Sequence, residues 1–113
     1  MPGMNRATVV LILLLAALLE VGGDAIVRAG LHRTGLLPKV LLFLLGAGVL
    51  FSYGYAVNAP AWDFGRLLGL YVVFFFVIAQ LIAWLAFGQM PTLARICGGA
   101  LIVAGGVVIA WFQ

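Results

Sequence analysis

The stretch Ala7-Thr-Val-Val-Leu-Ile-Leu-Leu-Leu-Ala-Ala-Leu-Leu-Glu20-Val-Gly-Gly-Asp24 places an acidic side chain well inside an apolar run. Residues 7–19 carry no charge, and the run reaches the roughly 20 residues of a membrane-spanning helix only if Glu20 and Asp24 lie within it. A carboxylate at that depth is costly. Such residues indicate, by default, a pathway for an ion or a substrate.

The rest of the chain has the composition of a membrane protein. It has 113 residues, of which 66% are hydrophobic and 8% charged, and its mean hydropathy is +1.29. The uncharged stretches 40–62, 67–94 and 96–113 each reach or approach the length of a span. We therefore predict an all-α integral membrane protein with a single domain, 1–113, and four transmembrane helices near 7–29, 38–58, 66–87 and 92–112. The connecting loops are short, so neighbouring helices are expected to be antiparallel, with both termini on one side.

Other residue types point away from an enzyme. The net charge of +3 comes from cations in the loops, which favours anionic lipid headgroups as partners over nucleic acid. The lone Cys97 and the lone His32 fall on different segments, and the sequence has neither a metal-ligand cluster nor a phosphate-binding glycine loop. We expect no catalysis, no cofactor and no metal. The first apolar run lacks a clean small-residue cleavage site, so we expect it to be retained as a span.

Polar residues recur every four positions along the first helix: Glu20, Asp24, Arg28 and His32. Asp24 before Arg28 is the favourable order for an ion pair at this spacing. Glu20 lies about 12 Å along the helix axis from Arg28, so it has no partner within its own helix. The sequence leaves open whether Asp24 and Arg28 form a structural pair or bind a substrate, whereas it makes Glu20 the leading candidate for a functional group.

The surroundings of Glu20 suggest how it would work. Low dielectric favours the protonated form of an unpaired carboxylate, and an organic cation would compete with the proton for it. Small residues on the flanking face either leave room for a substrate or permit close helix packing, and both hypotheses stay open. The face beside Glu20 consists of the small residues Ala16, Ala17 and Gly23, together with Val27.

Helix 3 carries two polar-capable side chains at depth, Tyr71 and Gln80. Nine residues correspond to about 180° of rotation, so at most one of them faces Glu20. Tyr71 has a ring face for a cation and a hydroxyl for Glu20, and Gln80 is suited to a bond between helices.

Small residues on helices 2 and 4 predict close packing. Helix 2 has Gly46, Gly48, Ser52 and Gly54, and helix 4 has glycine pairs at 98–99 and 105–106, which favour an association role for helix 4. Aromatic residues toward the span ends are interpreted first as interface anchors. They are Tyr53, Tyr55, Trp62, Trp84, Trp111 and Phe112.

Over nearly its whole length the chain resembles the small multidrug resistance family of the drug/metabolite transporter superfamily. The resemblance lies in four short spans and in three local patterns. These are Leu-Leu-Glu20-Val-Gly in helix 1, Trp84-Leu-Ala-Phe-Gly88-Gln89 at the end of helix 3, and Gly98…Leu101-Ile102…Ala104-Gly105 in helix 4. It implies that Glu20 binds protons and cationic substrates in turn, and that Tyr71 is the substrate-facing aromatic of helix 3. It also implies a homodimer, antiparallel in many members, in a bacterial inner membrane. Its interface would comprise Gly98, Leu101, Ile102 and Gly105.

The chain departs from that family at three places. The residues after Tyr71 are Val72-Val-Phe-Phe-Phe76 instead of small glycine-type residues. Asp24 and Arg28 are additional polar residues in helix 1. The opening of helix 3, Phe64-Gly65-Arg66, is closer to a less characterised branch of the same superfamily.

The leading hypothesis is a proton-coupled antiporter that exports small organic cations, quaternary ammonium or guanidinium-like, through a site at a dimer interface. Two alternatives remain. One is a transporter of a lipid-linked or neutral metabolite, with Asp24 and Arg28 as a zwitterion-binding pair. The other is a non-transporting membrane scaffold subunit in which Glu20 is held by a bond between helices.

Overall fold

The computed structural model describes residues 5–112, and this part of the chain is helical apart from short connections. The helices are α1 (Arg6–Leu31), α2 (Leu36–Val57), α3 (Phe64–Phe87) and α4 (Leu93–Trp111). Every end agrees with the predicted spans to within two residues. Residues 1–4 and 113 of the predicted domain lie outside the described part. All four helices are long and apolar enough to cross a membrane, which indicates a multi-pass membrane protein.

Side chains at the helix starts account for some of these boundaries. The Asn5 Oδ1 accepts a hydrogen bond of 2.8 Å from the Thr8 backbone N–H, and the Thr92 Oγ1 accepts one of 3.2 Å from that of Arg95. Asp63 occupies the cap position of α3, but its side chain makes no capping hydrogen bond.

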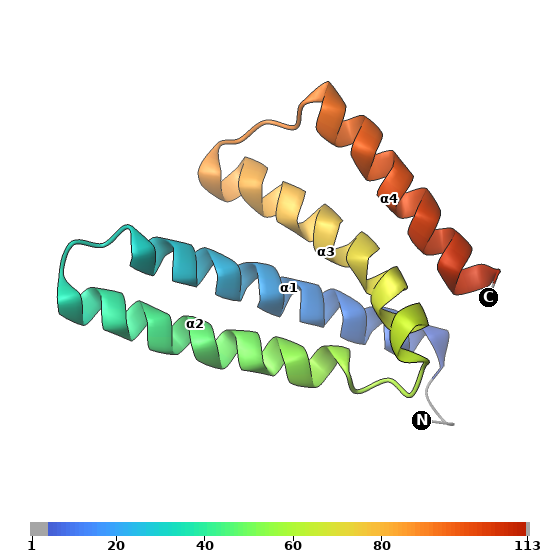
Figure 1. The fold of residues 1–113 in the computed structure, drawn as a ribbon, viewed down its shortest axis with the longest axis horizontal. Helices are drawn as coiled ribbons and strands as arrows, with labels where there is room; N and C mark the ends of the chain where they lie inside the picture. The colour runs from blue at the N-terminus through green and yellow to red at the C-terminus, as the bar shows by residue number, and fades with distance from the viewer. Residues whose placement is uncertain (1–4, 113) are drawn as a thin grey trace.

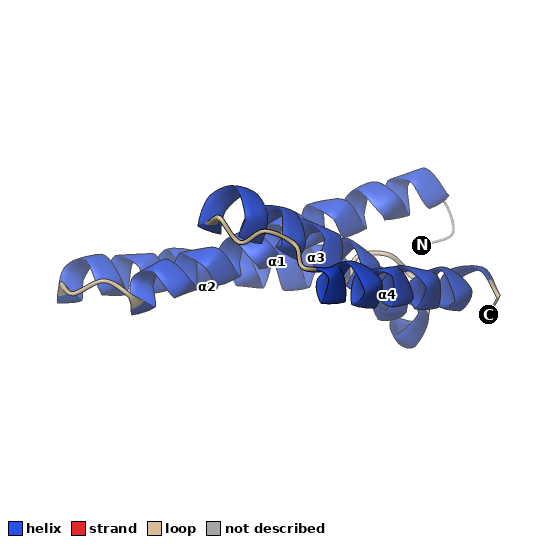
Figure 2. Ribbon diagram, turned by 90° about the horizontal axis from the view of Figure 1, so that it is seen from above, coloured by secondary structure: helices blue, strands red, loops and turns tan. Residues whose placement is uncertain are grey.

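The four helices form two pairs that converge at one end. Helices α1 and α2 lie side by side along their lengths, whereas α3 diverges from α1 and α4 lies along the far side of α3 (Figure 1). The bundle is thin, with extents of 50 × 36 × 19 Å (Figure 2). The buried core lies where the pairs converge, near both termini, and takes residues from all four helices: Val9, Leu13, Ala16, Ala17, Val57, Leu67, Leu70, Tyr71 and Ala110.

Glycines bring α1 and α2 into close contact. A Cβ atom at Gly23 would lie 2.7 Å from the Leu50 Cδ2, and one at Gly46 would lie 2.7 Å from the Val27 Cγ2. A larger residue at either position would have to displace the side chain of Leu50 or of Val27. The small residues of α1 beside Glu20 thus serve helix packing, which favours the packing hypothesis for this face.

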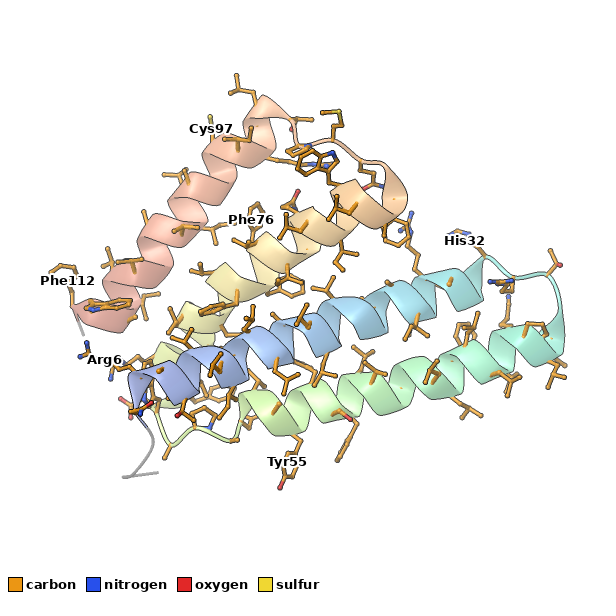
Figure 3. The ribbon with its side chains drawn as sticks, turned by 180° about the vertical axis from the view of Figure 1, so that it is seen from behind. Arg6, His32, Tyr55, Phe76, Cys97 and Phe112 are labelled. Atoms are coloured by element: carbon orange, nitrogen blue, oxygen red, sulfur yellow. The ribbon has the colours of Figure 1, made fainter. Side chains whose placement is uncertain are left out.

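The predicted packing face of α2 is only partly correct. Gly46 is buried, but added Cβ atoms at Gly48 and Gly54 would meet nothing within 4 Å. Ser52 is exposed and its hydroxyl donates to the Gly48 carbonyl. Tyr55 projects away from the other helices and is 78% exposed (Figure 3). Apart from Gly46, this predicted face points outward from the single chain.

The two glycine pairs of α4 divide between two faces. Gly99 and Gly106 lie against Phe76 and Val73 of α3, where an added Cβ would clash. At Gly98 and Gly105 an added Cβ would meet nothing within 4 Å. Only one column of glycines is therefore used within the chain, and the other is left open.

Candidate functional site

The Glu20 carboxylate is held by a hydrogen bond from the neighbouring helix pair. The Tyr71 hydroxyl donates to the Glu20 Oε1 at 2.7 Å, and the Ala16 carbonyl oxygen lies 3.4 Å from the same hydroxyl. Tyr71 is 4% exposed, whereas Glu20 is half-buried. The hydroxyl contact expected from the sequence is thus confirmed. Glu20, which has no partner on its own helix, finds a neutral one on α3.

Two further aromatic rings surround Tyr71. The ring centroid of Tyr53, from α2, lies 5.5 Å from that of Tyr71, and the centroid of Phe75 lies 6.4 Å from it. Both distances fall in the range of favourable aromatic pairs. Tyr53 was expected to be an interface anchor, but it is half-buried beside the site. Its place near the end of α2 is typical of an anchor, and only the convergence of α2 with α3 brings it to Tyr71.

Asp24 and Arg28 do not form the ion pair that their order along the helix favours. Among the residues that the structure describes, no carboxylate lies within salt-bridge distance of Arg28. Its guanidinium lies instead over the Phe87 ring, with the central carbon 5.8 Å from the ring centroid. A guanidinium at this distance is attracted by the face of the ring. Arg28 therefore reaches across to α3 rather than back to its own helix.

An open-sided crevice separates α1 from α3 beyond the Glu20–Tyr71 bond. Its volume is about 300 Å³. Both Asp24 and Arg28 line it, together with Val21, Ala25, Phe75, Ala79, Ile82, Ala83, Phe87 and Gln89. The structure thus brings Glu20, Tyr71, Asp24 and Arg28 to the junction of α1 and α3, where the two helix pairs begin to diverge.

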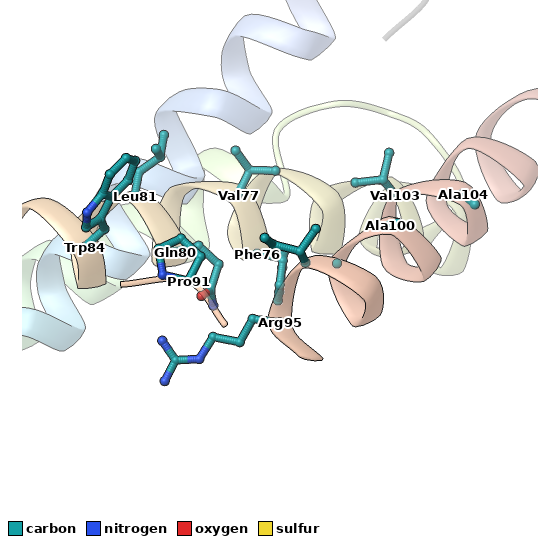
Figure 4. A pocket seen from close by; sticks show the side chains of 12 residues that line it. Phe76, Val77, Gln80, Leu81, Trp84, Pro91, Arg95, Ala100, Val103 and Ala104 are labelled. Atoms are coloured by element: carbon teal, nitrogen blue, oxygen red, sulfur yellow. The ribbon is translucent and has the colours of Figure 1, made fainter. Parts of the chain in front are cut away.

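Gln80 lies elsewhere, as the rotation between it and Tyr71 requires. It lines an apolar groove of about 590 Å³ between α3 and α4 (Figure 4). Arg95 is the only ionisable residue in the lining of this groove. The groove has no acidic group for a cation, which makes it a poor candidate for proton-coupled binding.

Three of the four predicted interface residues of α4, Gly98, Leu101 and Gly105, lie on its open side. Added Cβ atoms at Gly98 and Gly105 would have free space, and Leu101 is 75% exposed. Ile102 is half-buried. Within residues 5–112 nothing covers α4 at Gly98 and Gly105, which leaves this face available for another helix.

Arg66 has a structural role that the sequence did not reveal. Its Nη2 donates to the Ala110 carbonyl oxygen at 2.8 Å, and its guanidinium carbon lies 4.3 Å from the centroid of the Trp62 ring. Ala110 is in the last turn of α4, where carbonyls lack helical partners. The sequence drew attention to Arg66 only as part of the Phe64-Gly65-Arg66 opening of α3, which does not predict a contact with α4.

No group of three or more potential metal ligands from His, Cys, Asp and Glu occurs within residues 5–112. In comparisons with known proteins, no family model, no curated protein and no solved structure matches the chain.

Proposed function

We propose that this chain is a proton-coupled antiporter that exports small organic cations, either quaternary ammonium or guanidinium-like. Glu20 is the shared site for the proton and the cation. The single observation that carries the proposal is a half-buried carboxylate, one helical turn before the crevice residue Asp24, that is held by a neutral hydroxyl and, within residues 5–112, by no cation. A carboxylate without a counter-ion in a spanning helix is costly unless its charge is neutralised by a ligand.

Exchange follows from competition for one negative charge. A proton or an organic cation neutralises Glu20, so binding of one displaces the other. The Tyr71 hydroxyl occupies one carboxylate oxygen and fixes the orientation of the group, leaving the second oxygen for the ligand. The rings of Tyr53 and Phe75 add aromatic faces suited to a quaternary ammonium or guanidinium group.

A second copy of the chain completes the transporter in this proposal. The described bundle is only 19 Å thick along its shortest axis and leaves many large apolar side chains exposed, so we infer that a path across the membrane is shared with a second copy. The open column of Gly98 and Gly105 permits close approach of another helix. The resemblance to the small multidrug resistance family supports a homodimer, antiparallel in many members, in a bacterial inner membrane.

Proteoliposomes containing the purified protein test the proposal. Loading them with a quaternary ammonium or guanidinium compound should drive proton movement in the opposite direction, and Glu20→Gln should abolish it. The matched control is Asp63→Asn, which removes an acid from the connection between α2 and α3 and should leave the exchange intact. Normal exchange by Glu20→Gln would show that Glu20 is not the coupling site.

A second candidate is a non-transporting membrane subunit. The observation in its favour is that the Glu20–Tyr71 bond links α1 to α3, which is a structural role in itself. In that case no cation would release protons from the folded protein, the unmodified protein would show no flux, and Glu20→Gln would lower its thermal stability.

A further inference from the structure

The crevice between α1 and α3 contains both a negative and a positive side chain that lack each other as partners. Asp24 and Arg28 are one helical turn apart, in the order that favours pairing. Arg28 nevertheless extends over Phe87 on the opposite wall. Two opposite charges on one side of a spanning helix thus remain available to a ligand.

The walls of the crevice keep it open for a small ligand. Ala25 on α1 and Ala79 and Ala83 on α3 line it, and their methyl groups leave the space between the helices unfilled. A volume of about 300 Å³ is at the lower end of the range for small-molecule sites. The space suits a compact ligand and not a long acyl chain.

The charges are arranged in a sequence along the crevice. Asp24 and Arg28 line the crevice, with Arg28 beside Phe87, and Glu20 lies outside the lining, one turn before Asp24 on α1. A compact ligand with its cationic end beside Asp24 and its anionic end on the guanidinium would compensate both charges of the crevice. A guanidinium is well suited to a carboxylate or phosphate because it offers two parallel N–H donors.

We propose that the crevice is a subsite for amphoteric ligands, in which Arg28 binds an anionic group and Asp24 lies beside the cationic one. This inference rests on the proposed function, because it names the class of cargo that the Glu20 site would accept. The favoured cargo is a small organic cation that also bears a carboxylate or a phosphate a few ångströms from its positive centre.

A matched pair of probes tests this. Choline and glycine betaine share a trimethylammonium group, and only the second has a carboxylate. Binding of each is measured by isothermal titration calorimetry on the protein in nanodiscs, and exchange is measured in proteoliposomes. The variants are Arg28→Gln, Arg28→Lys and, as a control, Arg33→Gln in the exposed turn after α1.

We expect Arg28→Gln to weaken betaine binding by about tenfold or more, as for the loss of a charge-assisted hydrogen bond, and to leave choline binding unchanged. Arg28→Lys should restore part of the loss, and Arg33→Gln should match the unmodified protein. Should Arg28→Gln fail to fold, Ala83→Leu, which fills the crevice from α3, should also weaken betaine binding.

The outcomes separate this inference from the proposed function. Equal effects of Arg28→Gln on the two probes, or betaine binding no tighter than choline binding, would overturn the amphoteric subsite while exchange of choline would still support the antiporter. Betaine binding that depends on Arg28 without any proton exchange would support the subsite and overturn the antiporter. If neither choline nor glycine betaine binds, the subsite is overturned.

Discussion

Replacing Tyr71 by Phe removes one oxygen atom from the centre of the site. The hydroxyl that donates to Glu20 at 2.7 Å is lost, while the ring stays between Tyr53 and Phe75. The substitution leaves the volume of the buried side chain almost unchanged, so the core that contains Tyr71 should remain intact. The effect should fall on the orientation and solvation of the Glu20 carboxylate.

The magnitude follows from the kind of bond that is lost. A hydrogen bond to a charged group contributes about 1.5–3 kcal/mol, and about 1.4 kcal/mol corresponds to a tenfold change in affinity. Because the bond is already present without a ligand, only its contribution to holding the carboxylate in place enters the affinity, so Tyr71→Phe should weaken binding of a quaternary ammonium probe by roughly tenfold, with roughly 150-fold as the upper limit.

Isothermal titration of the protein in nanodiscs measures this change. The matched control is Tyr53→Phe, which removes a hydroxyl from the adjacent ring at 5.5 Å without touching the Glu20–Tyr71 bond. It should alter the affinity by less than Tyr71→Phe does. Unchanged binding by Tyr71→Phe, alongside lost binding by Glu20→Gln, would refute the positioning role of Tyr71.

Two further predictions concern packing. Gly106→Ala places a methyl group on Val73 and should destabilise the fold by about 1–3 kcal/mol, seen as a lower thermal midpoint by circular dichroism in detergent. The added methyl group of Gly105→Ala meets free space, so this variant should keep the thermal midpoint of the unmodified protein but weaken self-association in analytical ultracentrifugation. Equal midpoints for Gly106→Ala and Gly105→Ala would contradict the α3–α4 packing. Arg66→Gln should cost about 1–3 kcal/mol through loss of the bond to the Ala110 carbonyl, and Arg66→Lys should recover only part of it because lysine lacks the planar fork. Full stability of Arg66→Gln would count against a structural role for this contact.

The lengths of the apolar stretches and the polar residues between them were sufficient to predict the four helices, because the thickness of a bilayer sets the length of a membrane-spanning helix. The rotation between Tyr71 and Gln80 was predictable for a similar reason, since helix geometry fixes it within one element. These predictions needed no knowledge of how the helices are arranged.

What failed depended on relations between helices. Spacing alone left open whether Asp24 pairs with Arg28, and Phe87 on α3 offers Arg28 another partner. The two glycine columns of α4 are equivalent in sequence, so only the packed structure shows that Gly106 and not Gly105 lies on α3. Tyr53 enters the site for the same reason, through the contact between α2 and α3.

The convergence of the helix pairs at one end gives the molecule a pivot. The core and the contacts of Tyr71 and Arg66 lie near this end, whereas α1 and α3 separate toward the other. From Tyr71 to Phe87 is about 24 Å of helix, so a rocking motion of about 10° about the pivot would displace the far end by about 4 Å. Such a motion would open or close the crevice beside Arg28, while the hydrogen bond from Tyr71 to Glu20 changed little.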